Sequence, residues 1–164
     1  MKVKKYLEFF LSYFRRIYIF ESKKNSNILN FKNFKLKKYS SLRQIKNNEL
    51  IKFIKKQKKT YRFKLKQKLL VLFYKKVFVC SGWIYEGSFW KITEINQQIE
   101  IKGKILLFDF FTLPKYRNKG FYSKILLLIK NIRTNKIFLI YCLKNNTASK
   151  IGILNSKFKL IKQI

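Results

Sequence analysis

The stretch Leu113-Pro114-Lys115-Tyr116-Arg117-Asn118-Lys119-Gly120-Phe121-Tyr122 decides how this sequence is interpreted. It lies between an apolar, strand-like run at residues 105–112 and an apolar segment with helical character at residues 121–132. The first amides of a helix lack intrahelical partners, and together with the helix dipole they favour an anion. Gly120 lets a ligand approach the backbone closely. The stretch therefore predicts a phosphate cradle, unless Gly120 only turns the chain and the cations belong to a general lysine excess.

Strand-like and helix-like segments alternate on both sides of this turn. Apolar and β-branched runs predict a hairpin of two central strands, a weakly alternating third strand, and then the strongest strand of the chain, at residues 69–73, 77–85, 90–101 and 105–112. After the turn we expect a helix, a strand, a short helix and a closing strand, at residues 121–132, 136–143, 147–154 and 158–161. Such alternation indicates an α/β sheet, with ligands where its strands end or separate.

The segment before the hairpin is less regular. We expect a short amphipathic helix at residues 1–15, a strand at 17–20 and a polar loop at 22–33. Ser40 or Ser41 would cap a helix that runs to about Gln57.

Length and charge limit the classes of protein. With 164 residues, 48% of them hydrophobic, the chain has the core of one domain, residues 1–164, and no room for two. The net charge of +32 favours anionic ligands such as nucleic acid, acidic lipid or nucleotide-bearing molecules, although an AT-rich genome would also enrich lysine. Residues 1–76 contain 24 Lys and Arg against three acids, whereas residues 77–164 contain 15 against four. The basic excess therefore lies mainly ahead of the motif.

Some kinds of chemistry are excluded by composition. The chain has no histidine, and its two cysteines, Cys80 and Cys142, lie in apolar runs, so zinc sites and Cys-His catalysis cannot be assembled. Acid and base roles then fall to carboxylates, Tyr, Lys, thiols or water. No run is long and apolar enough for a transmembrane helix, and no signal-peptide cleavage site follows the basic start. We expect a cytoplasmic protein.

Arg117 and Gly120 are three residues apart, and Tyr122 follows two residues later. This spacing resembles the coenzyme A signature of the GNAT superfamily of N-acetyltransferases, Arg/Gln-x-x-Gly-x-Gly/Ala between a strand and a helix. Tyr122 departs from it, as in some members that modify sugars. A second likeness follows the next strand, where Asn146-x-Ala148-Ser149 and then Phe158-Lys159 resemble another family motif. The resemblance covers residues 77–164, together with a weaker likeness at Trp83-Ile84-Tyr85-Glu86-Gly87.

The resemblance implies an α/β fold: a single GNAT-like domain with flanking helices and a mixed, mostly antiparallel central sheet. The sheet would splay between its fourth strand, about 105–112, and its fifth, about 136–143. Residues 77–164 would form the half that binds acyl-coenzyme A, and residues 1–76 the basic half on the acceptor side. Acetyl-coenzyme A, the co-substrate, would enter the wedge and contact Phe110, Phe111, Thr112, Arg117, Asn118, Lys119, Gly120, Phe121, Tyr122, Asn146 and Ser149.

The implied function is transfer of an acetyl or short acyl group from acyl-coenzyme A to an amine or hydroxyl of a small acceptor. The sugar-modifying likenesses and the basic surface favour a nucleotide-linked amino sugar as that acceptor. Two alternatives remain open. The basic segment Lys46–Lys76, with Phe53, Tyr61 and Phe63 interleaved for stacking, could bind nucleic acid, although no RNA-recognition signature is apparent. A GNAT fold without catalysis is the other.

The acid and base are harder to assign. Many members use a Tyr where this chain has Ile153, so Tyr141, Tyr122 or water would have to substitute. Asp109 is a carboxylate inside an apolar strand, which calls for a function or for an ion pair with a basic neighbour. Glu86 is the other candidate base, unless it is a solvated turn residue. We therefore expect the catalytic residues among Asp109, Glu86 and Tyr141, and no metal site.

Overall fold

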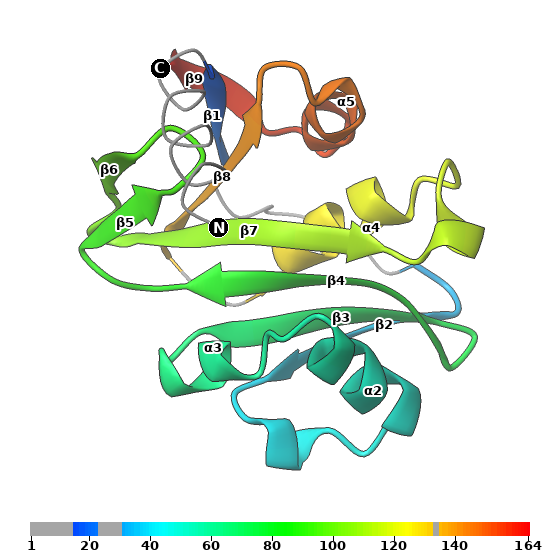
Figure 1. The fold of residues 1–164 in the computed structure, drawn as a ribbon. Coiled ribbons are helices and arrows are strands. Elements are labelled where there is room, and N and C mark those ends of the chain that lie inside the picture. The colour runs from blue at the N-terminus through cyan, green and yellow to red at the C-terminus, as the bar shows by residue number, and fades with distance from the viewer. Residues whose placement is uncertain (1–14, 23–30, 133–134) are drawn as a thin grey trace, which may run out of the picture.

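The computed structural model describes residues 15–22, 31–132 and 135–164 (Figure 1). Seven strands form one sheet in the order β2-β3-β4-β7-β8-β1-β9, and β5 and β6 form a separate small sheet. The strands are β1 (Ile17–Ser22), β2 (Phe34–Tyr39), β3 (Lys68–Tyr74), β4 (Val77–Tyr85), β5 (Phe89–Ile92), β6 (Gln97–Glu100), β7 (Lys104–Thr112), β8 (Ile137–Leu143) and β9 (Lys159–Gln163). The helices are α2 (Asn48–Lys56), α3 (Tyr61–Lys64), α4 (Phe121–Ile129) and α5 (Thr147–Asn155).

The architecture is the expected α/β domain with a mixed sheet and flanking helices. Every neighbouring pair of strands is antiparallel except β7 and β8, which are parallel. The helix expected at residues 1–15 and most of the loop expected at 22–33 lie outside the described residues. Within the described part of the chain, no helix has the length and apolar character needed to cross a membrane.

Both faces of the sheet are covered by apolar layers. Alternate side chains of β3 point to opposite faces: Leu69 and Val71 pack with α2 and the β5–β6 hairpin, whereas Leu70 and Leu72 pack with α4. Figure 1 shows α2 and α3 on one side of the sheet and α4 on the other. A strand buried on both faces reads as a continuous apolar run, which is why the β3–β4 hairpin was predictable.

Three elements differ from the sequence-based expectations. The run at 90–101, predicted as one strand, is the hairpin β5–β6, because the intervening turn contains Asn96 with a left-handed φ of 50°. The helix predicted from Ser40 or Ser41 begins only at Asn48, because the side chain of Asn47 caps it by accepting from the Leu50 amide at 2.8 Å. Strand β2 was not predicted, because the alternation of Phe34 and Leu36 with lysines is interrupted at Lys38, where a further apolar side chain would be expected.

The first strand lies far from its sequence neighbours. β1 lies between β8 and β9 and is antiparallel to both, with Ile17 opposite Leu143 and Tyr18 opposite Gln163. The Ile17 amide donates to the carbonyl of Ile164 at 2.7 Å. A strand from the basic first half of the sequence therefore completes the part of the sheet that the second half builds.

Candidate active site

β7 and β8 separate along their length and open a wedge in the sheet. Their parallel pairing runs from Lys104 opposite Ile137 to Leu107 opposite Ile140, and then stops (Figure 1). Beyond this point β7 keeps its other neighbour, β4, with Thr112 opposite Cys80. The strands splay where the family resemblance implied, and among the described residues the backbone of β7 from residue 108 onward is paired on one edge only.

A β-bulge lies at the start of the splayed part of β7. The register with β4 shifts between Ser81 and Trp83, so that Gly82 faces both Asp109 and Phe110. Asp109 takes a left-handed φ of 51°, a conformation that bulges use and that increases strand twist. A Cβ on Gly82 would lie 2.3 Å from the Phe110 ring, so only glycine lets this ring lie over β4. The bulge was not predicted, although a glycine inside a buried strand is its usual sequence signal.

The carboxylate of Asp109 is held by two cations. Lys59 Nζ and Arg62 Nη1 each lie 2.7 Å from Asp109 Oδ2, and the carboxylate side chain is 30% exposed. The guanidinium of Arg62 also lies over the rings of Phe108 and Trp83, 5.0 and 5.3 Å from their centroids. These contacts anchor α3 over the bulge. The structure thus shows the ion-pair alternative for Asp109.

The turn after β7 leads into α4 through two left-handed residues. Asn118 has a φ of 58°, and Gly120, the N-cap of α4, has a φ of 72° and contributes no side-chain cap. The amides of the first helical turn are therefore not satisfied from within the helix or by its N-cap side chain. Arg117 folds back on β7, where its Nε donates to the Thr112 carbonyl at 3.3 Å and its guanidinium lies over Phe111.

Tyr122, which departs from the family signature, points toward α5. Its ring lies 5.5 Å from the ring of Phe110, and a Cβ on Gly152 of α5 would lie 2.4 Å from it. Burial raises the pKa of the Tyr122 hydroxyl above its usual value. Gly152 of α5 thus makes room for the Tyr122 side chain at the start of α4, and this packing suits Tyr122 better for a structural role than for acid catalysis.

Asn146 caps the second helix at the wedge. Its side-chain oxygen accepts from the Ser149 amide at 3.1 Å, which satisfies one of the free donors at the start of α5. Both residues line the cavity at the wedge, on the face of the sheet that α4 also covers.

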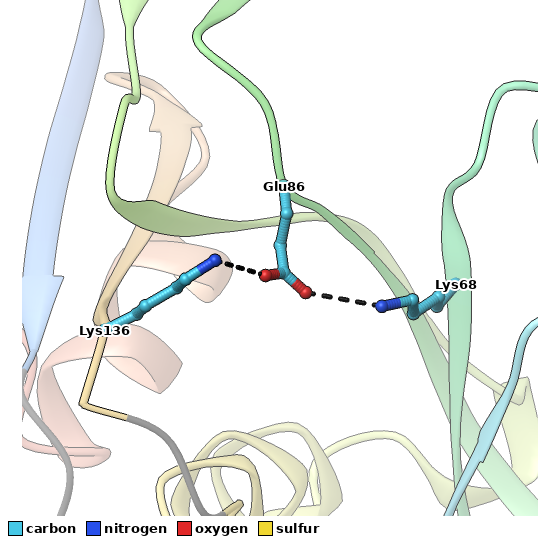
Figure 2. A network of polar contacts seen from close by, with 3 residues as sticks. All are labelled: Lys68, Glu86 and Lys136. Atoms are coloured by element: carbon cyan, nitrogen blue, oxygen red, sulfur yellow. Dashed lines mark hydrogen bonds and ion pairs between the residues drawn. The ribbon is translucent and has the colours of Figure 1, made fainter.

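Glu86 lies away from the wedge. It follows Tyr85, which pairs with Leu106 near the beginning of β7, whereas the bulge is nearer the end of that strand. Figure 2 shows its carboxylate between Lys136 Nζ at 2.7 Å and Lys68 Nζ at 3.4 Å. The hydrogen bond from Lys136 is the main reason that the pKa of this carboxyl is lowered. The structure does not bring Glu86 to the other predicted site residues.

Tyr141 lies at the closed end of the wedge, one residue beyond the last pair between β7 and β8. Its hydroxyl accepts a hydrogen bond from Trp90 Nε1 of the β5–β6 hairpin at 3.4 Å. Burial first, and then the negative charge of Glu94, raise the pKa of Tyr141 to about 12. Sequence reasoning missed Trp90, Glu94 and Arg62 because their positions depend on how α3 and the hairpin fold over the sheet.

One cavity of about 1260 Å³ joins these groups and reaches both faces of the sheet. Every predicted site residue lines it except Glu86 and Lys119. On the face covered by α4 and α5 its lining includes Gly120, Phe121, Tyr122, Ser123, Cys142, Asn146, Ser149 and Gly152. On the other face the lining includes Tyr61, Arg62, Gln67, Trp90, Lys91, Glu94, Phe108 and Tyr141. A ligand can therefore enter from the helices and meet a second ligand beneath α3 and the hairpin.

Comparison with known proteins supports the fold. No protein-family model matches the chain, and no curated protein sequence matches it. Its structure is similar to an acetyltransferase of the GNAT family from Colwellia psychrerythraea, with a TM-score of 0.61 at 12% identity over 91% of this chain and 53% of that one. A GCN5-related N-acetyltransferase from Sphaerobacter thermophilus gives a TM-score of 0.52 at 8% identity over 91% and 49% of the two chains.

A conserved protein of unknown function from Staphylococcus epidermidis is also similar, with a TM-score of 0.63 at 9% identity. The match covers 91% of this chain and 59% of that one, so the chain spans roughly half to three-fifths of the length of these structures. At such identities the likeness establishes the fold.

Proposed function

We propose that this protein, whose fold is that of the GNAT acetyltransferases, transfers an acetyl or short acyl group from acyl-coenzyme A to a small acceptor. The observation that carries this proposal is the wedge between β7 and β8, because one cavity joins the uncapped start of α4 to the polar groups on the opposite face of the sheet.

The residues present suit coenzyme A. The first-turn amides of α4 and the guanidinium of Arg117 offer donors and positive charge to a pyrophosphate. The splayed edge of β7 at Phe110, Phe111 and Thr112 offers backbone groups to the two amides of the pantetheine arm, much as a strand edge receives a peptide. When bound, acyl-coenzyme A supplies the thioester whose carbonyl carbon is attacked.

The chemical step needs no covalent enzyme intermediate. An acceptor nitrogen or oxygen forms a bond to the carbonyl carbon, the carbon–sulfur bond breaks, the electron pair leaves on sulfur, and the attacking atom loses a proton to water. A pKa of about 12 keeps the Tyr141 hydroxyl protonated at neutral pH, so it can donate a hydrogen bond to the departing sulfur. Trp90 Nε1 fixes the oxygen of that hydroxyl. Asp109 is better suited to positioning α3 than to accepting a proton, since two cations contact its Oδ2.

Calorimetric titration with acetyl-coenzyme A tests this function against the nucleic-acid alternative. We expect acetyl-coenzyme A to bind at both 50 and about 200 mM salt, whereas affinity for single-stranded nucleic acid that rests on phosphate contacts should fall by orders of magnitude over that range. Release of the coenzyme A thiol with a panel of amines and amino sugars then measures transfer. If acetyl-coenzyme A does not bind, the proposal fails. Binding without transfer to any acceptor would favour a fold that lacks catalysis.

A nucleotide-linked amino sugar is the acceptor that the basic surface favours. Lys55, Lys56 and Lys58 lie at the end of α2 and just after it, exposed, and immediately precede Lys59, which contacts Asp109 at the cavity. An anionic acceptor would be drawn there by the summed field. Changing the three exposed lysines to Gln should raise the apparent KM for a nucleotide-linked amino sugar and leave acetyl-coenzyme A affinity unchanged. An unchanged KM would exclude this acceptor site.

A further inference from the structure

The cavity carries far less positive charge than the protein as a whole. The chain has a net charge of +32, yet the cavity lining contains three cations, Arg62, Lys91 and Arg117, and two carboxylates, Asp109 and Glu94. Both carboxylates are on the face opposite α4, away from the proposed pyrophosphate site. These carboxylates make the electrostatic potential on that face of the cavity less positive than the net charge of the protein would suggest.

The two carboxylates differ in what holds them. Asp109 is neutralised by Lys59 and Arg62, each 2.7 Å away. Glu94 has no ion pair with any of the described residues; its Oε2 accepts a hydrogen bond from the Thr93 hydroxyl at 3.2 Å. It is half-buried in the turn of the β5–β6 hairpin. Of the charged groups lining the cavity in the described structure, Glu94 is thus the anion that remains available to a ligand.

Three aromatic side chains, Trp90, Phe108 and Tyr141, line the same cavity as Glu94. The Trp90 ring lies 4.5 Å from the Phe108 ring, and its Nε1 donates to the Tyr141 hydroxyl. Aromatic faces attract a cation, and a nearby carboxylate adds to that attraction. The hairpin that carries Glu94 also contacts Tyr141 through Trp90, and Tyr141 marks the closed end of the wedge, where a thioester would react.

We propose that Glu94 is the residue that selects a cationic amine over a hydroxyl at the acceptor end of the cavity. This inference rests on the proposed acyl transfer, because it assumes that the sulfur of coenzyme A reaches the closed end of the wedge. Glu94 binds the ammonium form of the acceptor beside Trp90 and Tyr141, and the ammonium loses one proton to water before its nitrogen, which then has a lone pair, attacks the thioester. It is a specificity residue that touches the acceptor, and the lysines outside the cavity bind whatever anionic part the acceptor has.

The test uses coenzyme A derivatives that carry the acceptor group on sulfur, so the natural acceptor need not be known. S-(2-aminoethyl)-coenzyme A and S-(2-hydroxyethyl)-coenzyme A have similar size and differ in charge; the corresponding three-carbon pair covers a longer reach. Calorimetry measures all four, with coenzyme A itself, on the wild type, Glu94→Gln and Glu100→Gln. Glu100 is the matched control, because it is exposed on the same hairpin and does not line the cavity.

In the wild type, we expect at least one ammonium derivative to bind about fivefold more tightly than its hydroxyl partner, the size of effect that one partly exposed charge pair gives. Glu94→Gln should abolish this preference without changing the affinity for coenzyme A, and Glu100→Gln should retain it. A wild type with no preference, or a preference that survives in Glu94→Gln, would overturn the inference and leave the acyl-transfer proposal standing. If coenzyme A itself does not bind, both fail.

Discussion

Gly120 offers a test in which backbone strain and ligand binding can be separated. It has a φ of 72°, and Gly103, in the turn before β7, has a φ of 74°. A Cβ on Gly103 would meet no atom within 4 Å, and a Cβ on Gly120 would meet only Lys124 Nζ at 3.8 Å. Alanine at either position should therefore lower the free energy of unfolding by about 1–2 kcal/mol, mainly because a residue with a Cβ is strained in the left-handed conformation. Each variant should lower Tm by about 2–8 °C, at the rate of about 2–4 °C per kcal/mol for a protein of this size.

The two positions should differ in binding, because only Gly120 lines the cavity. A carboxylate introduced there, within about 4 Å of a bound phosphate charge, opposes binding by about 1 kcal/mol at the dielectric of water and about 4 kcal/mol at the effective value near a protein surface. Gly120→Glu should therefore weaken acetyl-coenzyme A binding by about fivefold to several hundredfold. Gly103→Glu should leave the affinity unchanged.

Calorimetric titration with acetyl-coenzyme A and differential scanning calorimetry on the same samples measure both quantities. The reasoning is refuted if Gly120→Glu binds acetyl-coenzyme A as the wild type does while its Tm shows that it is folded. It is also refuted if Gly103→Glu loses the same affinity, because the effect would then come from general charge or strain rather than from the start of α4.

Three further changes test the surroundings of the site. Gly152→Ala should destabilise the protein by about 1–3 kcal/mol through overpacking against the Tyr122 ring, offset in part by a gain of about 1 kcal/mol in helix propensity. Ile151→Ala, on the exposed side of the same helix, should change Tm little. Equal Tm values for the two variants would contradict the packing of Gly152 against Tyr122. The ionised Glu86 carboxylate stabilises the fold at pH values above 4.5, the usual pKa of this carboxyl, and this stabilisation is lost as the pH falls through its lower pKa in the folded protein. The free energy of unfolding, measured in urea at pH 7 and pH 3, should therefore decrease more for the wild type than for Glu86→Gln. Asp109→Asn should lower stability by about 1 kcal/mol, measured in urea, whereas a loss of turnover of about 10² at unchanged stability would instead make Asp109 the base.

Much of the second half of the fold could be predicted because each local signal agrees with the final structure. Apolar patterns bounded by polar turns or caps mark the strand at 105–112 and the two helices that follow it, and Gly120 marks the turn between the strand and the first helix. The family resemblance, rather than the apolar pattern, led us to expect Arg117 and Asn146 at one site, and both line the same cavity. In β2 the apolar alternation includes only Phe34 and Leu36 before Lys38 interrupts it, which is too short a pattern to be detected.

The acceptor side could not be predicted to the same extent. Glu94 comes near Tyr141 only because the β5–β6 hairpin folds over the sheet, and the turn sequence alone contains no information about that placement. The bulge that turns Asp109 toward Lys59 and Arg62 depends on Gly82 of the neighbouring strand. Such long-range pairings set a side chain's partners, whereas periodicity predicts only which face it occupies.

The insertion of β1 between β8 and β9 has a consequence for how the protein is made. During synthesis β1 emerges before both of its partners, and Ile17 cannot pair until Leu143, about 126 residues later in the chain, has been synthesised. Closing so long a loop is slow, and until then both edges of β1 can pair with other strands. β9, whose neighbour in the sheet is β1, cannot join before it. Nascent chains stalled before residue 137 should therefore expose β1 to proteases or chaperones, and those released with β8 and β9 should protect it.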